Sequence, residues 1–231
     1  MKEENQNDLM DKIISLAKRR GFIFPSSEIY GGFSSSYDYG PLGTELKYNI
    51  KNEWRKEMLQ FQDNIVGLDT AILMSPKVWQ ASGHLSAGFS DLLVECSKCH
   101  HRFRDDMVSG NKCPDCNGEL MSARKFNLMM KTFVGPVEDD ASVTYLRAET
   151  CQGIYLNYEN VLNSMRLKIP FGIAQIGKSF RNEINPGNFI YRMREFEQME
   201  MQFFINPDES EKWFNYWVEQ RLNWYIKLGI K

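Results

Sequence analysis

The sequence predicts an α+β fold with helices at both ends, an antiparallel pair of strands between them, and a small cysteine-rich insertion. Apolar residues recur at helical spacing in residues 8–20 and 209–228. Residues alternate strictly from Phe196 onward and follow a second strand-like segment, 173–181, across a long loop. Four of the five cysteines form two Cys-x-x-Cys pairs in a segment that is poor in large apolar residues.

The composition indicates a packed globular protein. The 231 residues suffice for one large domain or for a domain with an insertion. A hydrophobic content of 42% with 13% aromatic residues excludes a disordered chain. Because the net charge is only −2, a polyanionic ligand must be bound by local patches, such as Lys178, Arg181, Arg192 and Arg194.

The sequence carries no sign of export or of a membrane span. Residues 1–12 are polar and acidic and lack the apolar core of a signal peptide. No segment approaches the roughly 20 consecutive apolar residues of a spanning helix. Paired cysteines favour a metal site in a reducing compartment over disulfides. We therefore expect a cytoplasmic protein that has no membrane partner.

The first half of the chain predicts two helices and one strand. Leu9, Ile13 and Leu16 form the apolar stripe of a helix over 8–20, which Gly21 ends. Residues 30–43 are a Gly/Ser/Tyr-rich turn region. A second helix follows, with apolar residues at steps of four: Leu42, Leu46, Ile50 and Trp54. Residues 64–74 are apolar and strand-like.

The second half predicts strands at 143–148 and 173–181 with a helix at 154–165 between them. A final helix over 209–228 carries Trp213, Trp217 and Trp224 on or near its apolar side. We divide the chain into a first part of one domain (1–95), the insertion (96–119) and the continuation of that domain (120–231).

The segment 178–202 is the most informative about function. Its alternation predicts one face with Phe196, Gln198, Glu200 and Gln202, and another with Glu197, Met199, Met201 and Phe203. The loop before it contains Pro186-Gly187 and exceeds the usual length of about two to five residues for a hairpin, which is typical of functional loops. Arginines and carboxylates on one hairpin suit a ligand with both phosphate and ammonium groups.

The cysteine pairs predict a structural zinc site. Cys96 and Cys99 precede Cys113 and Cys116, and two such pairs supply the four thiolates of a tetrahedral ion. Because four thiolates leave no open position, the zinc is expected to be structural. His100 and His101 are alternative ligands that we expect to face solvent. Cys151 stands alone and is expected to be a small packed residue.

In addition, the chain resembles the bacterial dimeric type of glycyl-tRNA synthetase, a class II aminoacyl-tRNA synthetase. The segment FRNEINPGNFIYRMREFEQMEMQFF resembles the second class-defining motif and the strand after it, and spans about 173–204 with its preceding strand. GGFSSSYDYGPLG and the following helix, at about 30–60, resemble the first motif region. Further matches follow in order: PKVWQASGH, FSDLLVECSKCHHRFRDD, FNLMMKTFVGP and LRAETCQGIYLNY.

This resemblance implies a six- or seven-stranded antiparallel sheet flanked by helices. It also implies a ligase that joins glycine to ATP as glycyl-adenylate, releases pyrophosphate and passes glycine to tRNA(Gly). ATP with Mg²⁺, a structural Zn²⁺ and a homodimer are the implied cofactors and assembly.

The resemblance also implies roles for single residues. Arg181 would be the catalytic residue that holds the α-phosphate, for which an arginine fork is suited. Phe196 would stack on adenine, and Arg192 or Arg194 would meet phosphate. The implied ATP-binding residues are Arg181, Asn182, Glu183, Tyr191, Arg192, Met193, Arg194, Glu195 and Phe196. The implied glycine-binding residues, whose carboxylates would hold the ammonium group, are Arg104, Glu149, Phe196, Glu197, Gln198, Met199 and Glu200.

Simpler structural roles remain open for these residues. Arg181 and Glu183 are also compatible with a strand-surface ion pair, and Glu200 with the solvent side of an edge strand. Ala148 and Cys151 replace a proline and an alanine that are usual in the family. Ala148 loosens the backbone that enters the pocket at Glu149, whereas Cys151 is nearly isosteric with alanine.

The third class-defining motif and the anticodon-binding domain are absent from these residues. We therefore expect an incomplete portion of the ligase that is inactive alone. One alternative is a non-enzymatic synthetase-like binding module. Another is a zinc-knuckle RNA-binding protein, which the mixed charge of residues 96–119 disfavours.

Overall fold

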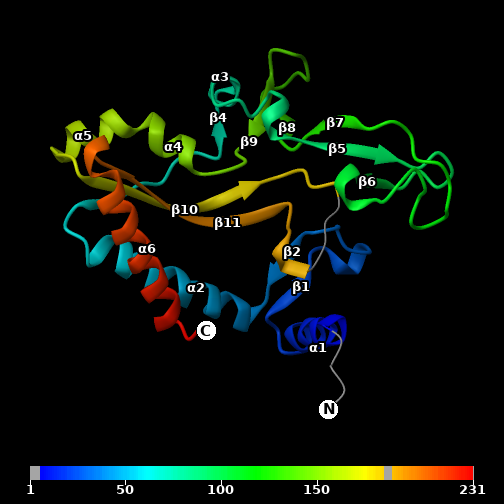
Figure 1. The fold of residues 1–231 in the computed structure, drawn as a ribbon, viewed down its shortest axis with the longest axis horizontal. Coiled ribbons are helices and arrows are strands. Elements are labelled where there is room, and N and C mark those ends of the chain that lie inside the picture. The colour runs from blue at the N-terminus through cyan, green and yellow to red at the C-terminus, as the bar shows by residue number, and fades with distance from the viewer. Residues whose placement is uncertain (1–5, 185–188, 231) are drawn as a thin grey trace. The chain divides into compact units, whose positions relative to one another are not determined.

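The computed structural model describes residues 6–184 and 189–230 (Figure 1). Our expectations for the first five residues and for Pro186-Gly187 therefore lie outside the described residues. The chain forms two compact units. The first unit contains residues 1–47, 72–149 and 178–197, and the second contains residues 48–71, 150–177 and 198–231. Since three segments build each unit, neither is continuous in sequence.

The first unit begins with a helix and a small hairpin. Helix α1 (Gln6–Arg19) ends as predicted at Gly21, whose φ of +70° favours glycine. Strands β1 (Ile23–Pro25) and β2 (Tyr37–Tyr39) pair antiparallel, and β2 lies within the region 30–43 that we expected to be turns. A Cβ on Gly40 would lie 2.4 Å from the Gly21 carbonyl oxygen, so this close approach requires glycine.

Two three-stranded antiparallel sheets complete the first unit. One has the order β4 (Leu73–Met74), β9 (Val143–Leu146), β8 (Met130–Phe133). The other has the order β6 (Arg102–Arg104), β5 (Ser90–Glu95), β7 (Arg124–Asn127). Helix α3 (Pro76–Ala81) starts with Ser75 as its N-cap, and its Trp79 packs with Met129 and Ala148.

The second unit is built on a sheet with the order β11 (Glu195–Phe204), β10 (Phe171–Phe180), β3 (Ile65–Gly67). Strands β10 and β11 also supply their residues 178–180 and 195–197 to the first unit. Strand β3 is parallel to β10. The remaining elements of this unit are the end of α2 (Pro41–Arg55) and the helices α4 (Cys151–Leu156), α5 (Tyr158–Met165) and α6 (Ser210–Lys227).

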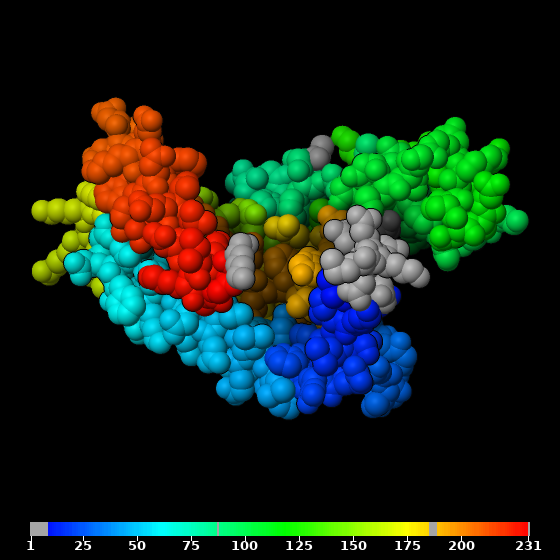
Figure 2. Space-filling model, turned by 60° about the horizontal axis from the view of Figure 1, so that its bottom comes forward, coloured from blue at the N-terminus to red at the C-terminus, as the bar shows by residue number. Residues whose placement is uncertain are grey.

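The predicted alternation along β11 is confirmed. Met199, Met201 and Phe203 pack on a core that contains Trp54, Met58 and Ile65, together with the predicted Trp217 and Trp224 of α6. Figure 2 shows α6, coloured orange to red, beside the cyan segment that follows α2. An ion pair of 2.9 Å between Lys227 Nζ and Glu57 Oε1 joins the same two segments. One face of β11 therefore packs against the hydrophobic core.

Three expectations are corrected by the structure. Residues 154–165 form two helices instead of one, because α4 ends at Asn157. Residues 64–74 form two short strands in different sheets. A single sheet of six or seven antiparallel strands is not found among the described residues, whose sheets have two or three strands. The parallel β3–β10 pair is possible because about a hundred residues connect the two strands, which provides the long crossover that parallel pairing requires.

Within the part of the chain that the structure describes, no helix is long and apolar enough to cross a membrane.

Candidate functional site

The four paired cysteines converge on one point. The Sγ atoms of Cys96, Cys99, Cys113 and Cys116 all lie within 4.8 Å of one another. The distance is 3.5 Å between the sulfurs of Cys96 and Cys116, and 3.7 Å between those of Cys99 and Cys113. Disulfide sulfurs would be about 2.0 Å apart, whereas four thiolates around a tetrahedral zinc ion lie about 3.8 Å apart. The cluster is therefore suited to a metal ion.

Both cysteine pairs adopt the same turn. The backbone N–H of His100 donates to the Cys96 carbonyl oxygen at 3.0 Å, and that of Asn117 donates to the Cys113 carbonyl oxygen at 2.9 Å. His100 and Asn117 both have positive φ, at 57° and 58°. The repeated geometry aims both sulfurs of each pair at the same point.

The thiols of this cluster differ in pKa: burial and hydrogen bonds to the neighbouring cysteine side chains raise the pKa of Cys99 to about 12, whereas backbone donors favour the thiolate form of Cys96. A hydrogen bond from the backbone N–H of Cys99 lowers the pKa of the Cys96 thiol to about 6. Gly118 packs so closely that a Cβ there would lie 2.9 Å from Cys96 Sγ. His101 is exposed and pairs with Asp115 at 2.5 Å. His100 is exposed as well, and both histidines are solvent-facing as expected.

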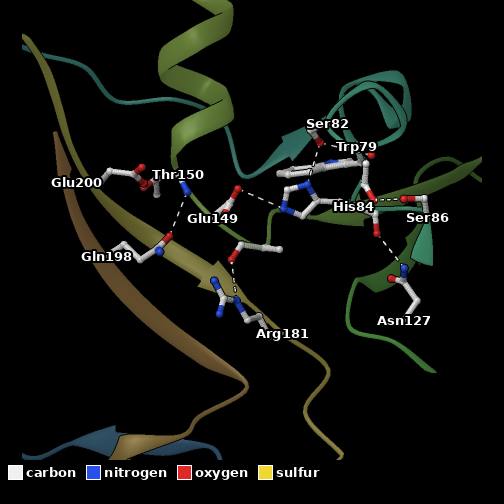
Figure 3. Close-up of polar contacts among 12 residues, drawn as sticks. Trp79, Ser82, His84, Ser86, Asn127, Glu149, Thr150, Arg181, Gln198 and Glu200 are labelled. Carbon is white, nitrogen blue, oxygen red and sulfur yellow. Dashed lines mark hydrogen bonds and ion pairs between the residues drawn. The ribbon is translucent and has the colours of Figure 1, made fainter. Parts of the chain in front are cut away.

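Arg181 is a cation held between two aromatic rings in the first unit. Its guanidinium carbon lies 5.3 Å from the ring centroid of Phe196 and 5.6 Å from that of Phe89. Its Nε donates to the Ala148 carbonyl oxygen at 3.3 Å (Figure 3). No carboxylate among the described residues lies within ion-pair distance of Arg181. The positive charge is thus positioned without being neutralised.

The alternative ion pair between Arg181 and Glu183 is excluded, because Glu183 belongs to another cluster. The buried Glu183 carboxylate lies 3.2 Å from Arg192 Nε. Arg104 binds Asp106 through two hydrogen bonds of 3.0 and 2.8 Å and lies 3.5 Å from Asp91. Asp106, and secondarily Asp91 and Glu183, raise the pKa of Arg104. Arg104 and Arg192 are therefore both paired with carboxylates. We call these two arginines and Asp91, Asp106 and Glu183 the carboxylate cluster.

Three other candidates for ATP binding, Arg194, Glu195 and Asn182, have hydrogen-bond or ion-pair partners within the protein. Arg194 donates to the carbonyl oxygens of Ser34 and Glu183 at 3.0 and 3.3 Å, which ties residue 34 to the segment before β11. Glu195 pairs with Lys178 and raises its pKa. The backbone N–H of Asn182 donates to the Leu128 carbonyl oxygen at 2.8 Å. Tyr191 is exposed and Met193 is half-buried.

Glu149, a candidate for glycine binding, contacts a buried histidine in the first unit. His84 Nε2 lies 3.2 Å from Glu149 Oε1, and Ser82 Oγ lies 2.9 Å from His84 Nδ1 (Figure 3). Asn127 Nδ2 donates to the His84 carbonyl oxygen at 2.8 Å. The Glu149 side chain is thereby connected to α3 and β7.

In the second unit, the candidates Gln198 and Glu200 are both hydrogen-bonded to Thr150. The backbone N–H of Thr150 donates to Gln198 Oε1 at 3.1 Å, and its hydroxyl donates to Glu200 (Figure 3). Gln202 Nε2 donates to the other oxygen of Glu200 at 2.7 Å. Among the described residues β11 is an edge strand of its sheet, and Glu200 is a half-buried, hydrogen-bonded carboxylate on the polar face of that strand.

Three candidates on β11 lie away from that polar face or have other contacts. Glu197 forms an ion pair of 2.5 Å with Lys47. Met199 packs on the hydrophobic core. Phe196 offers one face of its ring to Arg181.

Sequence reasoning missed His84, Ser82, Asn127 and Thr150. His84 lies in the segment PKVWQASGH, which we noted only as a stretch of resemblance. Thr150 adjoins Glu149 in sequence. A small hydroxyl residue at that position carries no motif of its own, so the contact with Glu200 needed the structure.

Comparison with known proteins identifies relatives along nearly the whole chain. The chain is 58% identical over 233 residues to a protein named glycine--tRNA ligase from Treponema denticola, covering 99% of this chain and 51% of that protein. It is 51% identical over 243 residues to a protein of the same name from Thermobifida fusca, covering 97% and 52%. The chain spans about half the length of these curated relatives.

Residues 136–231 match the family model described as tRNA synthetase class II core domain (G, H, P, S and T). A crystal structure of the RNA binding domain of threonyl-tRNA synthetase from Cryptosporidium parvum shares the fold, with a TM-score of 0.56 at 17% identity. That similarity covers 85% of this chain and 38% of the other. The class II synthetase-like α+β fold is thus confirmed, and along nearly its whole length the chain is similar to proteins named glycine--tRNA ligase, of which it spans about half the length.

Proposed function

We propose that this chain carries the glycine- and ATP-binding portion of a glycine--tRNA ligase. In the complete enzyme, glycine and ATP form glycyl-adenylate and pyrophosphate, and glycine then passes to tRNA(Gly). The observation that carries the proposal is the 51–58% identity to relatives of that name over 94–99% of the chain. The alternative of an unrelated RNA-binding zinc protein has no such support.

Arg181 is the proposed catalytic residue. Attack of the glycine carboxylate on the α-phosphorus forms the acyl–phosphate bond and breaks the bond to pyrophosphate. Negative charge on the non-bridging phosphate oxygens must be stabilised in this step. A guanidinium fixed between Phe89 and Phe196 without a carboxylate partner among the described residues supports this role. Because the group is already oriented, little reorganisation is needed during the reaction.

The remaining ATP contacts are proposed around Arg181. They comprise Asn182, Glu183, Tyr191, Arg192, Met193, Arg194, Glu195 and Phe196, with Mg²⁺ accompanying the phosphates. The face of the Phe196 ring opposite Arg181 is proposed to stack on adenine. The phosphate role of Arg192 requires it to exchange the Glu183 carboxylate for the ligand, whereas Arg181 has no such competitor at ion-pair distance among the described residues.

Glycine recognition is proposed for the carboxylates of Glu149 and Glu200, together with Gln198, Arg104 and the backbone at 196–200. Carboxylates with fixed directions suit an ammonium group, which donates three hydrogen bonds. The Glu149 contact with His84 and the Glu200 contact with Thr150 support fixed directions. Alanine would be rejected by exclusion of its methyl group.

The metal is proposed to be a structural Zn²⁺ on Cys96, Cys99, Cys113 and Cys116. Four sulfurs at mutual distances near those of a tetrahedral zinc site support it. We further propose a cytoplasmic homodimer.

A non-hydrolysable glycyl-adenylate mimic, glycyl-sulfamoyl-adenosine, tests the proposal by calorimetric titration. We expect it to bind the chain more tightly than the alanyl mimic. Equal binding of the two, or no binding of either, would contradict glycine recognition. Binding by the chain together with no glycine-dependent pyrophosphate exchange by the protein at the full length of its relatives would favour the alternative of a non-enzymatic binding module.

A further inference from the structure

His84 is immobilised by contacts on every side that the structure describes. Its side chain is buried, and its ring lies 5.3 Å from Trp79 and 4.7 Å from Phe89, measured between centroids. The hydrogen bond from Asn127 to its carbonyl oxygen fixes the backbone at the same residue. A ring held in this way can define the direction of any group bonded to its nitrogen atoms.

The contact with Ser82 favours one tautomer of the His84 ring. Its Oγ lies 2.9 Å from His84 Nδ1, whereas its other acceptor, the Trp79 carbonyl oxygen, is 3.4 Å away. The shorter distance favours donation of the hydroxyl hydrogen to Nδ1. A neutral imidazole has one donor and one acceptor nitrogen, so acceptance at Nδ1 leaves the hydrogen on Nε2. Nε2 then donates to Glu149 Oε1 across 3.2 Å.

From this arrangement we infer that His84 is a positioning residue, which orients the Glu149 carboxylate toward the ammonium group of glycine. The inference rests on the proposed function and extends it to a residue without a contact to the ligand. One hydrogen bond from Nε2 of the ring fixes the direction of the Glu149 carboxylate. A carboxylate offers about four acceptor positions, so this bond is compatible with further bonds to an ammonium group.

The competing explanation is that His84 only fills space between Trp79 and Phe89. Two ligands separate the explanations, because glycyl-sulfamoyl-adenosine contains the ammonium group and adenosine monophosphate lacks it. Removal of the hydrogen bond from His84 to Glu149 should weaken the binding of glycyl-sulfamoyl-adenosine only. Loss of packing would disturb both ligands or the stability of the first unit.

The test is calorimetric titration of the chain with both ligands. We expect His84→Ala to weaken glycyl-sulfamoyl-adenosine about tenfold and to leave adenosine monophosphate unchanged, since a hydrogen bond to a charged group is being removed. His84→Gln should restore most of the affinity, because its side-chain amide can donate near the position of Nε2. Ser82→Ala should lower the affinity for glycyl-sulfamoyl-adenosine by less, because it removes only the contact that favours hydrogen on Nε2. Ser86→Ala is the matched control, since its hydroxyl bonds to the Gly83 carbonyl oxygen in the same loop.

An equal loss of affinity for both ligands in His84→Ala, or no loss for either, would overturn the positioning role. If the unsubstituted chain binds neither ligand, the proposed function itself fails. Nitrogen-15 NMR of the histidine rings gives a check that needs no substitution at His84. The chain has only three histidines, which simplifies assignment. We expect hydrogen on Nε2 of His84, and hydrogen on Nδ1 alone would contradict the inference.

Discussion

Two arginine environments in the first unit differ in their partners. Arg181 lies between two aromatic rings and has no carboxylate at ion-pair distance among the described residues. Arg104 and Arg192 lie in a cluster with three carboxylates, Asp91, Asp106 and Glu183. A paired arginine has its charge satisfied by the protein, whereas an unpaired one retains its attraction for an external anion. The difference supports our proposal that Arg181 is the primary phosphate-binding residue.

Arg181→Ala should have the largest effect on ligand binding and catalysis. We expect glycine-dependent pyrophosphate exchange by the protein at the full length of its relatives to fall by about 100-fold or more, because a positioned cation at the developing charge is removed. Thermal unfolding should change little, since no ion pair is broken. Arg19→Ala, an exposed arginine on α1, is the control. Exchange at the unsubstituted rate would end the catalytic assignment.

Phe196→Ala should have the next largest effect. The substitution removes one of the two rings that hold Arg181 and the proposed surface for adenine. We expect the affinity for adenosine monophosphate to fall about tenfold, given the usual worth of cation–π and base-stacking contacts. Calorimetric titration measures the change, with the exposed Phe61→Ala as the control. An unchanged affinity would mean that the ring is only a packing residue.

Arg104→Ala should act more on stability than on binding. Asp91 and Asp106 lose their common partner, and we expect a small loss of stability, because Asp106 is exposed and its charge is screened by solvent. Affinity for glycyl-sulfamoyl-adenosine should fall by less than in Arg181→Ala. Chemical denaturation and titration of the same sample test both expectations. A larger loss of affinity than in Arg181→Ala would reverse the comparison and favour Arg104 as the main ligand contact.

Cys113→Ser should have the smallest effect on ligand binding. Strand β6, which carries Arg104, lies between the two cysteine pairs, so loss of the metal should loosen β6 and leave Arg181 in place. We expect elemental analysis to report one zinc fewer per chain, and hydrogen exchange to accelerate over residues 96–119. Cys151→Ser should retain the metal. Retention of one zinc per chain by Cys113→Ser would contradict the four-thiolate site.

Sequence patterns predicted the features that depend on local spacing. Helices α1 and α6, the strands β10 and β11 and the convergence of the four cysteines all follow from periodicity or motif spacing, and the structure confirms them. The short hairpin of β1 and β2 was missed, because strands of three residues carry no clear period. The break at Asn157 was missed because the apolar spacing continues across it.

The partners of the candidate residues could not be predicted from spacing. Arg181 and Glu183 are two residues apart and of opposite charge, yet Glu183 pairs with Arg192 instead. The contact of Glu149 with His84 joins residues that are far apart in sequence. Such pairs are set by tertiary packing. The different partners of the four candidate arginines, Arg104, Arg181, Arg192 and Arg194, are therefore visible only in the structure.

We propose that Arg181 meets the phosphate of the nucleotide directly, because it has no carboxylate at ion-pair distance among the described residues, whereas Arg192 must first exchange Glu183 for the ligand. Arginine side-chain NMR, recorded on the chain during titration with ATP and Mg²⁺, tests it directly. We predict that the Nε–H signal of Arg181 shifts with nucleotide concentration and that the signal of Arg104 stays in place. A shift of Arg104 or Arg192 with no change at Arg181 would contradict the account.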